Sequence, residues 1–270
     1  FEQAGLNINL VQLGSLADAQ RAYINGYADG LASTIIEAVQ ANVLGGEPSK
    51  IVLVPDFSNG GDVIVARKEF QNLKDLKGKT IGCEVSSLGI FLLQRALANA
   101  GLSLDDVKVI NTEQSQGQAS LLANKIDAFV SYPPESINIL KDDAYHTIFS
   151  SADIPKEIID TISISDEVLN KDSEFVAKLH KAWQLALDFH AQHPVEATKI
   201  MAERENISSQ DFNDVLSDLK ILNSADQAGL FGASSPLSKS VQEVCATLVH
   251  VGSIKTNCET LPNIIYQGGL

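Results

Sequence analysis

The chain is poor in basic residues. Its 270 residues include 20 Lys and Arg against 34 Asp and Glu, which gives a formal net charge of −14 at pH 7. Arginine occurs only at Arg21, Arg67, Arg95 and Arg204, without clustering. A nucleic-acid binder needs a basic stripe that displaces phosphate counterions, and an anionic membrane surface also attracts basic segments. We therefore expect neither partner.

The sequence also lacks the usual signatures of membrane spans, metal sites and catalysis. No apolar run approaches the ~20 residues of a spanning helix. No CxxC, HExxH, GxSxG, GxGxxG or P-loop pattern is present, so we expect no metal, no cofactor and no catalytic residue. The apolar fraction of 44% is ordinary for a globular chain, and the length fits roughly one or two domains.

Cysteine is rare. Cys83 falls in a short apolar run and is predicted to be a buried strand residue. Cys245 and Cys258 are separated by 13 positions, at the end of a predicted helix and in the loop after it. A disulfide and two free thiols are equally compatible with this spacing.

Short β-branched runs alternate with amphipathic stretches along the first 165 residues, which indicates an α/β fold with mostly parallel strands. The predicted strands are 7–13, 30–33, 51–55, 63–66, 80–84, 107–111, 128–131 and 162–165. The predicted helices among them are 17–25, 34–43, 88–100, 116–123 and 134–140. The remaining tail is predicted to be helical at 174–191, 194–205, 210–219 and 236–251.

An internal repeat indicates two similar lobes. Residues 2–31 resemble residues 98–129: each stretch contains Ala-Gly-Leu, a strand, a helix, a short turn and an Asp before a second strand. In the second copy a strand and a helix, 80–100, precede Ala-Gly-Leu. The repeat therefore predicts that roughly 20–25 residues, forming a first strand and helix, lie upstream of Phe1. The alternative is a fold that lacks this element.

The loop 56–62 is rich in Gly, Asn, Ser and Asp and separates two apolar strands, which is typical of a crossing between lobes. A second crossing is expected near 159–164. The predicted division is 1–62 and 161–270 for lobe 1, with the helical tail packed on it, and 63–160 for lobe 2. Two crossing strands make a hinge, and a hinge between lobes makes a cleft.

Ligands in open α/β sheets collect beyond the carboxyl ends of strands. The helix starts that follow Ser33-Thr34 and Ser86-Ser87, which we expect to occupy matching places in the two lobes, could hold an anionic group with their N–H donors. Alternatively, these hydroxyls only cap the helices. The predicted ligand-binding residues are Ser15, Ser33, Thr34, Asp56, Phe57, Ser58, Val85, Ser86, Ser87, Glu113 and Tyr132.

Four acidic residues lie beside predicted strand ends: Asp56, Asp62, Glu84 and Glu113. If two or more face the cleft, a ligand with an amine or amidine group is favoured. The alternative is that they are simply solvated. Tyr132 could supply a stacking face or a hydroxyl, or it could belong to the core.

Several motifs carry a resemblance to a known family. Residues 75–82 read Asp-Leu-Lys-Gly-Lys-Thr-Ile-Gly, 60–66 read Gly-Gly-Asp-Val-Ile-Val-Ala, and 126–134 end in Tyr-Pro-Pro. With Val-Ser-Ser at 85–87, they resemble periplasmic substrate-binding proteins of the nitrate, sulfonate and taurine type, a group that includes binders of thiamine-pyrimidine precursors. The similarity runs from Phe1 to about Glu205.

The resemblance implies a type II periplasmic-binding fold, in which two Rossmann-like lobes close on a small polar ligand. It places the family's cleft at Ser15, Thr34, Asp56, Ser58, Ser86, Ser87, Glu113 and Tyr132. It also implies a monomer in the periplasm or another extracytoplasmic space, with or without a membrane tether.

Two non-catalytic functions follow from the resemblance. The first is capture of a solute for the permease of an ABC importer; the second is ligand sensing, with the chain fused to a kinase- or cyclase-type signalling domain. An enzyme on the same fold is a third reading, but the Cys/His-rich motif of the pyrimidine-synthase relatives is absent. Where the family often has Trp-Glu-Pro-Tyr, this chain has Tyr132-Pro133-Pro134-Glu135, so the ligand is expected to differ.

Overall fold

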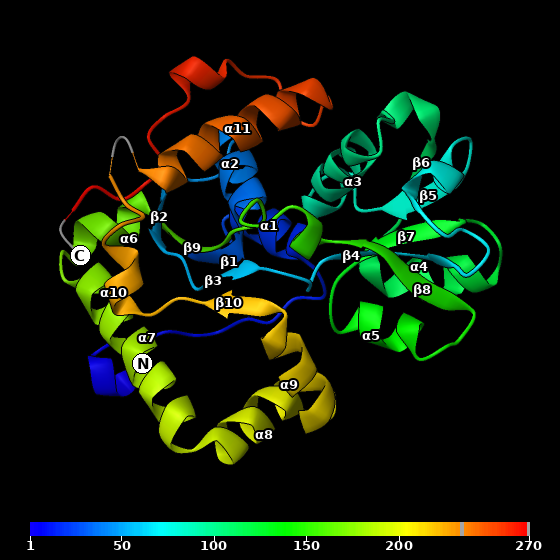
Figure 1. The fold of residues 1–270 in the computed structure, drawn as a ribbon. Coiled ribbons are helices and arrows are strands. Elements are labelled where there is room, and N and C mark those ends of the chain that lie inside the picture. The colour runs from blue at the N-terminus through cyan, green and yellow to red at the C-terminus, as the bar shows by residue number, and fades with distance from the viewer. Residues whose placement is uncertain (233–234, 269–270) are drawn as a thin grey trace. The chain divides into compact units, whose positions relative to one another are not determined.

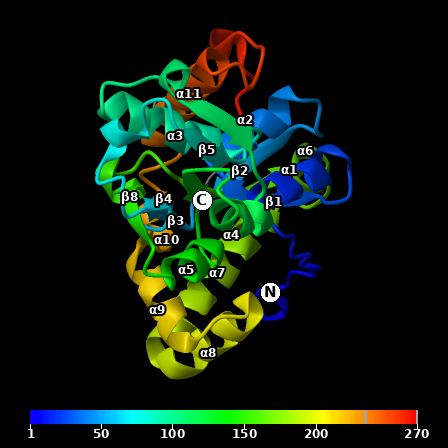
Figure 2. The same ribbon diagram turned by 90° about the vertical axis from the view of Figure 1, so that its right-hand side faces the viewer.

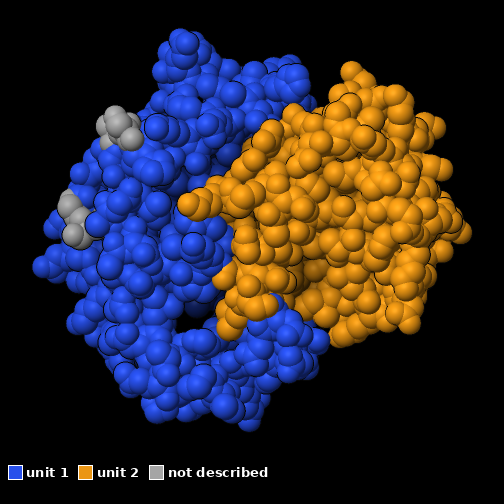
Figure 3. Space-filling model, viewed as in Figure 1, with its two compact units in different colours: residues 1–57, 159–214, 220–270 blue, residues 58–158, 215–219 orange. Residues whose placement is uncertain are grey.

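The computed structural model describes residues 1–232 and 235–268 (Figure 1). The chain divides into two compact units (Figure 3). Unit 1 comprises Phe1–Phe57, Ile159–Asp214 and Lys220–Leu270, and unit 2 comprises Ser58–Ile158 and Val215–Leu219. The chain therefore changes unit at Phe57–Ser58 and Ile158–Ile159, whereas the boundaries expected from the sequence follow Asp62 and Asp160. Residues 215–219 also belong to unit 2, so the chain crosses between the units more often than the two expected crossings.

Unit 2 is built on a five-stranded sheet with the order β6-β5-β7-β4-β8. Its strands are β4 (Val63–Arg67), β5 (Thr80–Cys83), β6 (Lys108–Asn111), β7 (Ala128–Ser131) and β8 (Tyr145–Ser150). β5 runs parallel to both β6 and β7, while β4 runs antiparallel to β7 and β8. The helices of this unit are α3 (Leu88–Asn99), α4 (Gln114–Leu122) and α5 (Glu135–Leu140).

Unit 1 contains a three-stranded sheet with the order β1-β9-β2. The strands are β1 (Gly30–Thr34), β2 (Ser49–Leu53) and β9 (Asp160–Ser165), and β9 is antiparallel to both neighbours. The expectation of mostly parallel strands is therefore wrong for this sheet, because its middle strand is the segment that returns from unit 2. The predicted strand 7–13 is also wrong: these residues form no strand.

The tail forms α6 (Asp166–Lys171), α7 (Phe175–Gln192), α8 (Pro194–Glu205), α9 (Ser209–Ser217), α10 (Ser224–Gln227) and α11 (Pro236–His250). Apart from residues 215–219, it belongs to unit 1, as expected. α7 packs Val176 and Leu179 against the strand residues Val52 and Leu53. α8 lies beside the end of α7 in both views (Figures 1 and 2). Between α9 and α10, β10 (Leu219–Ile221) pairs with β3 (Asp56–Ser58).

The internal repeat is visible in the structure. α1 (Leu16–Ile24) and α4 have equal lengths and lie 98 positions apart in the sequence. At the same offset, Gly26 and Asn124 both have a left-handed backbone, with φ of 74° and 56°. The turns close alike: Tyr27 N donates to Ala22 O, and Lys125 N donates to Ser120 O, each over 2.9 Å. The two units thus share a helix, a turn and a following strand, α1 to β1 and α4 to β7, whereas residues 7–13 form no strand to match β6.

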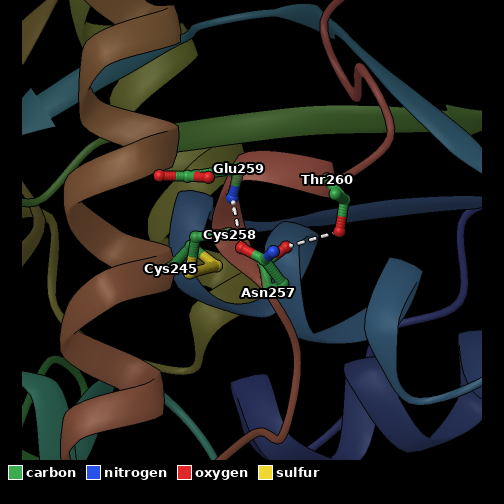
Figure 4. The surroundings of a disulfide bond; sticks show 5 residues. All are labelled: Cys245, Asn257, Cys258, Glu259 and Thr260. Atoms are coloured by element: carbon green, nitrogen blue, oxygen red, sulfur yellow. Dashed lines mark hydrogen bonds between the residues drawn. A yellow bond between two sulfur atoms is a disulfide. The ribbon is translucent and has the colours of Figure 1, made fainter.

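The tail is fastened by a disulfide. Cys245 on α11 is bonded to Cys258 in the loop that follows, with their Cα atoms 5.8 Å apart (Figure 4). Asn257 stabilises this loop: its side-chain oxygen accepts from Glu259 N and its carbonyl accepts from the Thr260 hydroxyl, both at 3.0 Å (Figure 4). The structure therefore decides the alternative that the sequence left open in favour of the disulfide.

Cys83 lies in β5 and is fully buried, as predicted. Burial raises the pKa of its thiol to about 12. Within the described ranges, the structure contains no helix with the length and hydropathy needed to cross a membrane. No group of three or more His, Cys, Asp and Glu side chains is placed to hold a metal ion in that part of the chain.

Candidate functional site

The three parallel strands of unit 2 end at one edge of the sheet. β5, β6 and β7 finish at Cys83, Asn111 and Ser131, so the loops that follow them are neighbours. Side chains help to join these ends: Val85 N donates to Asn111 Oδ1 over 3.1 Å, and the Ser131 hydroxyl donates to Gln114 Oε1 over 2.9 Å. This edge brings together the predicted residues Val85, Ser86, Ser87, Glu113 and Tyr132.

A buried carboxylate organises this edge. Glu84 is 2% exposed. Its Oε1 accepts from Gln114 N and its Oε2 accepts from the Ser87 hydroxyl, each over 3.4 Å. Ser87 occupies the N-cap position of α3 but makes no side-chain cap. The expectation that its hydroxyl caps the helix is therefore wrong: the hydroxyl donates a hydrogen bond to the Glu84 carboxylate and makes no cap to the first turn of α3.

The other predicted residues here differ in exposure. Val85, Ser86 and Glu113 are exposed, and Glu113 occupies the N-cap position of α4 without a side-chain cap. Tyr132 is half-buried, and its carbonyl accepts from Ser136 N over 3.1 Å. The edge thus combines two buried polar side chains, Glu84 and Ser87, with the exposed Val85, Ser86 and Glu113.

Ser58 opens unit 2 and belongs to a buried hydroxyl cluster. Its Oγ lies 2.8 Å from Ser151 Oγ, which also accepts from Gly60 N over 2.8 Å. Ser151 N in turn donates to Asp62 O over 2.8 Å. Gly60 has a φ of 133°, which an L side chain rarely adopts. This glycine therefore allows the loop to turn onto Ser151.

In unit 1, Thr34 and Glu37 form the start of α2 (Ile35–Val43). The Thr34 hydroxyl accepts from Ile36 N over 3.1 Å and donates to Glu37 Oε2 over 2.6 Å, and Thr34 N donates to the same oxygen over 3.0 Å. This capping box holds a fully buried carboxylate beside a helix N-terminus. Ser33 is buried next to it, and its hydroxyl donates to Thr34 O over 3.1 Å.

A pair of acids lies close to this helix start. Asp160 is opposite Thr34 in the β1–β9 register, and its side chain is hydrogen-bonded to Asp56. Asp56 is 6% exposed, and its Oδ1 has no partner among the described residues. Burial raises the pKa of the Asp56 carboxyl to about 6, against the lowering effect of the Asp160 hydrogen bond. The next residue, the half-buried Phe57, forms a bridge with Ile159.

Ser15 caps α1, accepting from Asp18 N over 3.2 Å. The offset of 98 that relates α1 to α4 pairs Ser15 with Glu113 and Thr34 with Tyr132. The expectation that Ser33-Thr34 matches Ser86-Ser87 is therefore wrong. Ser33 and Thr34 are the last residues of β1, whose counterpart is β7, whereas Ser86-Ser87 follows β5.

Sequence reasoning did not single out several residues that shape these edges. Glu37 was detectable, because Thr34-x-x-Glu37 has capping-box spacing. Gln114 is buried and donates through Nε2 to Val130 O over 3.2 Å. Ser151 and Asp160 had no local signal, since each acts on a residue distant in the sequence.

A separate pocket of about 280 Å³ lies in unit 2, near the carboxyl end of α3 and beside β8. Ser87 precedes the opposite end of that helix, so this pocket is remote from the strand ends. None of the predicted site residues lines it. Its lining residues are Asn72, Leu73, Lys74, Asn99, Ala100, Ile148, Phe149 and Asp153.

Comparison with known proteins begins with the sequence. A family model described as NMT1/THI5 like matches residues 1–197. A Brucella abortus protein named as a binding protein is 29% identical over 146 residues, which are 53% of this chain and 46% of that protein. The match thus spans about half the length of this curated relative.

Solved structures share the fold at lower sequence identity. The alkanesulfonate-binding protein SsuA from Xanthomonas axonopodis, bound to MOPS, superposes with a TM-score of 0.75 at 15% identity, covering 92% of this chain and 83% of its own. A Candida albicans gene product with the generic periplasmic binding protein fold superposes with a TM-score of 0.74 at 15% identity, covering 100% of this chain and 89% of its own. The fold is therefore that of periplasmic binding proteins, and neither neighbour is described as an enzyme.

Proposed function

Because this chain belongs to the NMT1/THI5-like family, we propose that it is an extracytoplasmic solute-binding protein that captures a small polar molecule for an ABC importer. The observation that carries the proposal is the gathering of helix starts and polar side chains at the strand ends of unit 2, around Glu84 and Ser87. Such edges are where α/β sheets hold ligands. The fold shared with a sulfonate-binding protein supports it.

The disulfide supports an extracytoplasmic location. Disulfides persist in oxidising compartments and are rare in the cytosol, and Cys245 and Cys258 are bonded here. A sensor domain fused to a signalling protein remains an alternative prediction from the sequence, with no structural observation in its favour.

The charge at the strand ends favours a ligand with an amine group. The loops 14–15, 33–34, 56–62, 84–87, 112–114 and 131–134 contain no Lys or Arg. Asp56, Asp62 and Glu84 in them are each less than a tenth exposed. A sulfonate bound here would rely on helix N-termini without a cationic side chain, whereas an ammonium group would meet carboxylates.

A thermal-shift screen of amines, sulfonates, amino acids and pyrimidines tests the proposal. A specific solute at 100 times its Kd should raise the free energy of unfolding by about 2.7 kcal/mol. Combined Ser86→Ala and Ser87→Ala should reduce the shift, while Ser173→Ala, at an exposed position before α7, should not. An unchanged shift in the double variant would place the site elsewhere.

Glu84→Gln separates the ligand classes. The substitution keeps the shape and removes the charge, so it should weaken an amine ligand about ten-fold or more. It should leave a sulfonate unaffected or improve its binding. Titration calorimetry on the wild type and on Glu84→Gln measures the change in affinity for each ligand class. Circular dichroism verifies that the variant is folded.

A further inference from the structure

Two of the places where the chain passes between its units are paired with each other. The first passage lies between Phe57 and Ser58, and the second lies between Ile158 and Ile159. Within unit 1, Phe57 forms an antiparallel bridge with Ile159. Within unit 2, Ser58 N donates to Ile158 O over 3.1 Å. The backbone therefore joins the two passages on both sides of the unit boundary.

A pair of acids continues this pairing by one residue. Asp56 precedes Phe57, Asp160 follows Ile159, and the two acidic side chains are hydrogen-bonded. An ionised carboxylate only accepts hydrogen bonds, so a bond between two carboxyl groups needs a proton on one of them. Asp56 is 6% exposed and Asp160 is half-buried. Because burial disfavours the charged form, the proton lies on Asp56.

The charged residues on β10, the partner strand of β3, do not neutralise this pair. The register of β10 and β3 is set by two backbone hydrogen bonds, from Leu222 N to Pro55 O and from Asn59 N to Asp218 O. This register places Lys220 opposite Phe57, so the exposed lysine lies on the other face of the strand from Asp56. Asp218 lies beside Gly60, beyond the first passage.

The elements packed against β9 do not supply a cation beside Asp160 either. β1 has no charged residue, and Lys50 of β2 lies opposite Ile164, four residues beyond Asp160. The start of α2 contributes one acid, the buried Glu37. The other charged groups belong to α6, which follows the far end of β9, and are Asp166, Glu167 and Lys171. A second negative charge at the pair would therefore be unfavourable.

We propose that Asp56 and Asp160 share one proton and that this proton fastens the two passages to each other. Its loss leaves two adjacent carboxylates, which repel each other. Burial raises the pKa of the Asp56 carboxyl to about 6. The folded protein therefore keeps the proton below about pH 5 and loses it as the pH rises through 6. The pairing of the passages thus depends on the pH of the medium.

The shared proton has a consequence for solute capture, and this step alone rests on the proposed function. A rearrangement of the units during capture must bend the chain where it passes between them. The residues that bend include Phe57, Ser58, Ile158 and Ile159. Proton loss at the neighbouring acids loosens these residues, so capture is coupled to pH.

The proton itself is tested by carbon-13 NMR of the aspartate carboxyl carbons. One aspartate signal should titrate with a midpoint near pH 6 in the wild type, and Asp56→Asn should abolish that titration. Asp29→Asn, at an exposed position in unit 1, is the control and should leave it unchanged. Full ionisation of every aspartate at pH 5 would overturn the proposal.

The fastening is tested by amide hydrogen exchange, corrected for the intrinsic effect of pH on exchange. The protonated fraction falls about 30-fold at 1.5 pH units above the pKa. The protection of the Ser58 amide in the wild type and in Asp29→Asn should therefore fall at least ten-fold between pH 5 and pH 7.5. Protection that does not change with pH in the wild type would refute the fastening.

Two variants replace the proton by a permanent donor. In Asp56→Asn the new amide donates to Asp160, and in Asp160→Asn it donates to Asp56. Protection of the Ser58 amide should then be independent of pH in both variants, whereas a wild-type fall in either folded variant would contradict the proposal. These measurements use no solute, so a failed solute screen refutes the proposed function and leaves the result on the acid pair intact.

Discussion

Replacing Asp56 by Asn should remove a pH-dependent loss of stability. Burial raises the pKa of this carboxyl from 3.8 to about 6. Between about pH 4 and pH 6, the folded chain therefore keeps a proton that the unfolded chain has already released. The stability that the protonated group contributes is complete below pH 4 and is lost as the pH rises through 6.

The difference between 3.8 and about 6 corresponds to about 3 kcal/mol in the free energy of unfolding. Asn cannot ionise, and its amide can still donate a hydrogen bond to Asp160. Asp56→Asn should therefore match the wild type near pH 4 and exceed it by up to about 3 kcal/mol at pH 7.

Urea unfolding at several pH values, followed by tryptophan fluorescence, measures this gain. The chain has one tryptophan, Trp183, on α7 of unit 1, the unit that contains Asp56. Asp29→Asn, at an exposed position in unit 1, is the control and should give a pH-independent difference. If the gap between Asp56→Asn and wild type were the same at pH 4 and pH 7, the burial argument would be refuted.

Two further predictions concern packing and the disulfide. Gly117→Ala should cost about 1–3 kcal/mol in urea unfolding, because the new Cβ would lie 2.1 Å from the ring of Phe129; Gly229→Ala, with nothing within 4 Å of its Cβ, should stay within about 0.5 kcal/mol of wild type. Breaking the bond between Cys245 and Cys258, 13 positions apart, should cost about 3 kcal/mol. Reductant should lower the Tm of the wild type and leave that of Cys245→Ser unchanged.

Local patterns predicted most helices to within two residues of their observed ends. α8 matches in full, because Pro194 sets its first turn and Asn206 ends it in a left-handed conformation. Long-range pairing was not predictable in the same way. β8 was missed because its exposed and buried positions do not alternate regularly. Residues 10–13 have a strand-like sequence but lack a partner.

In the candidate site, too, local features could be predicted from the sequence and long-range contacts could not. The strand-end rule located Thr34 and Ser87, since each follows an apolar run and precedes a helix. It could not predict that Ser87 would turn to Glu84 instead of capping its helix. Nor could it join Asp56 to Asp160, which come together only through the tertiary fold.

Each unit carries its own natural reporter. Unit 1 holds the chain's single indole, at Trp183, while unit 2 holds the one unbridged thiol, at Cys83, with no solvent exposure. Fluorescence therefore follows the unfolding of unit 1. The rate at which an alkylating reagent labels the Cys83 thiol reports the opening of unit 2. Both signals are present in the unmodified protein. They therefore allow a direct measurement of whether the two units unfold together or separately.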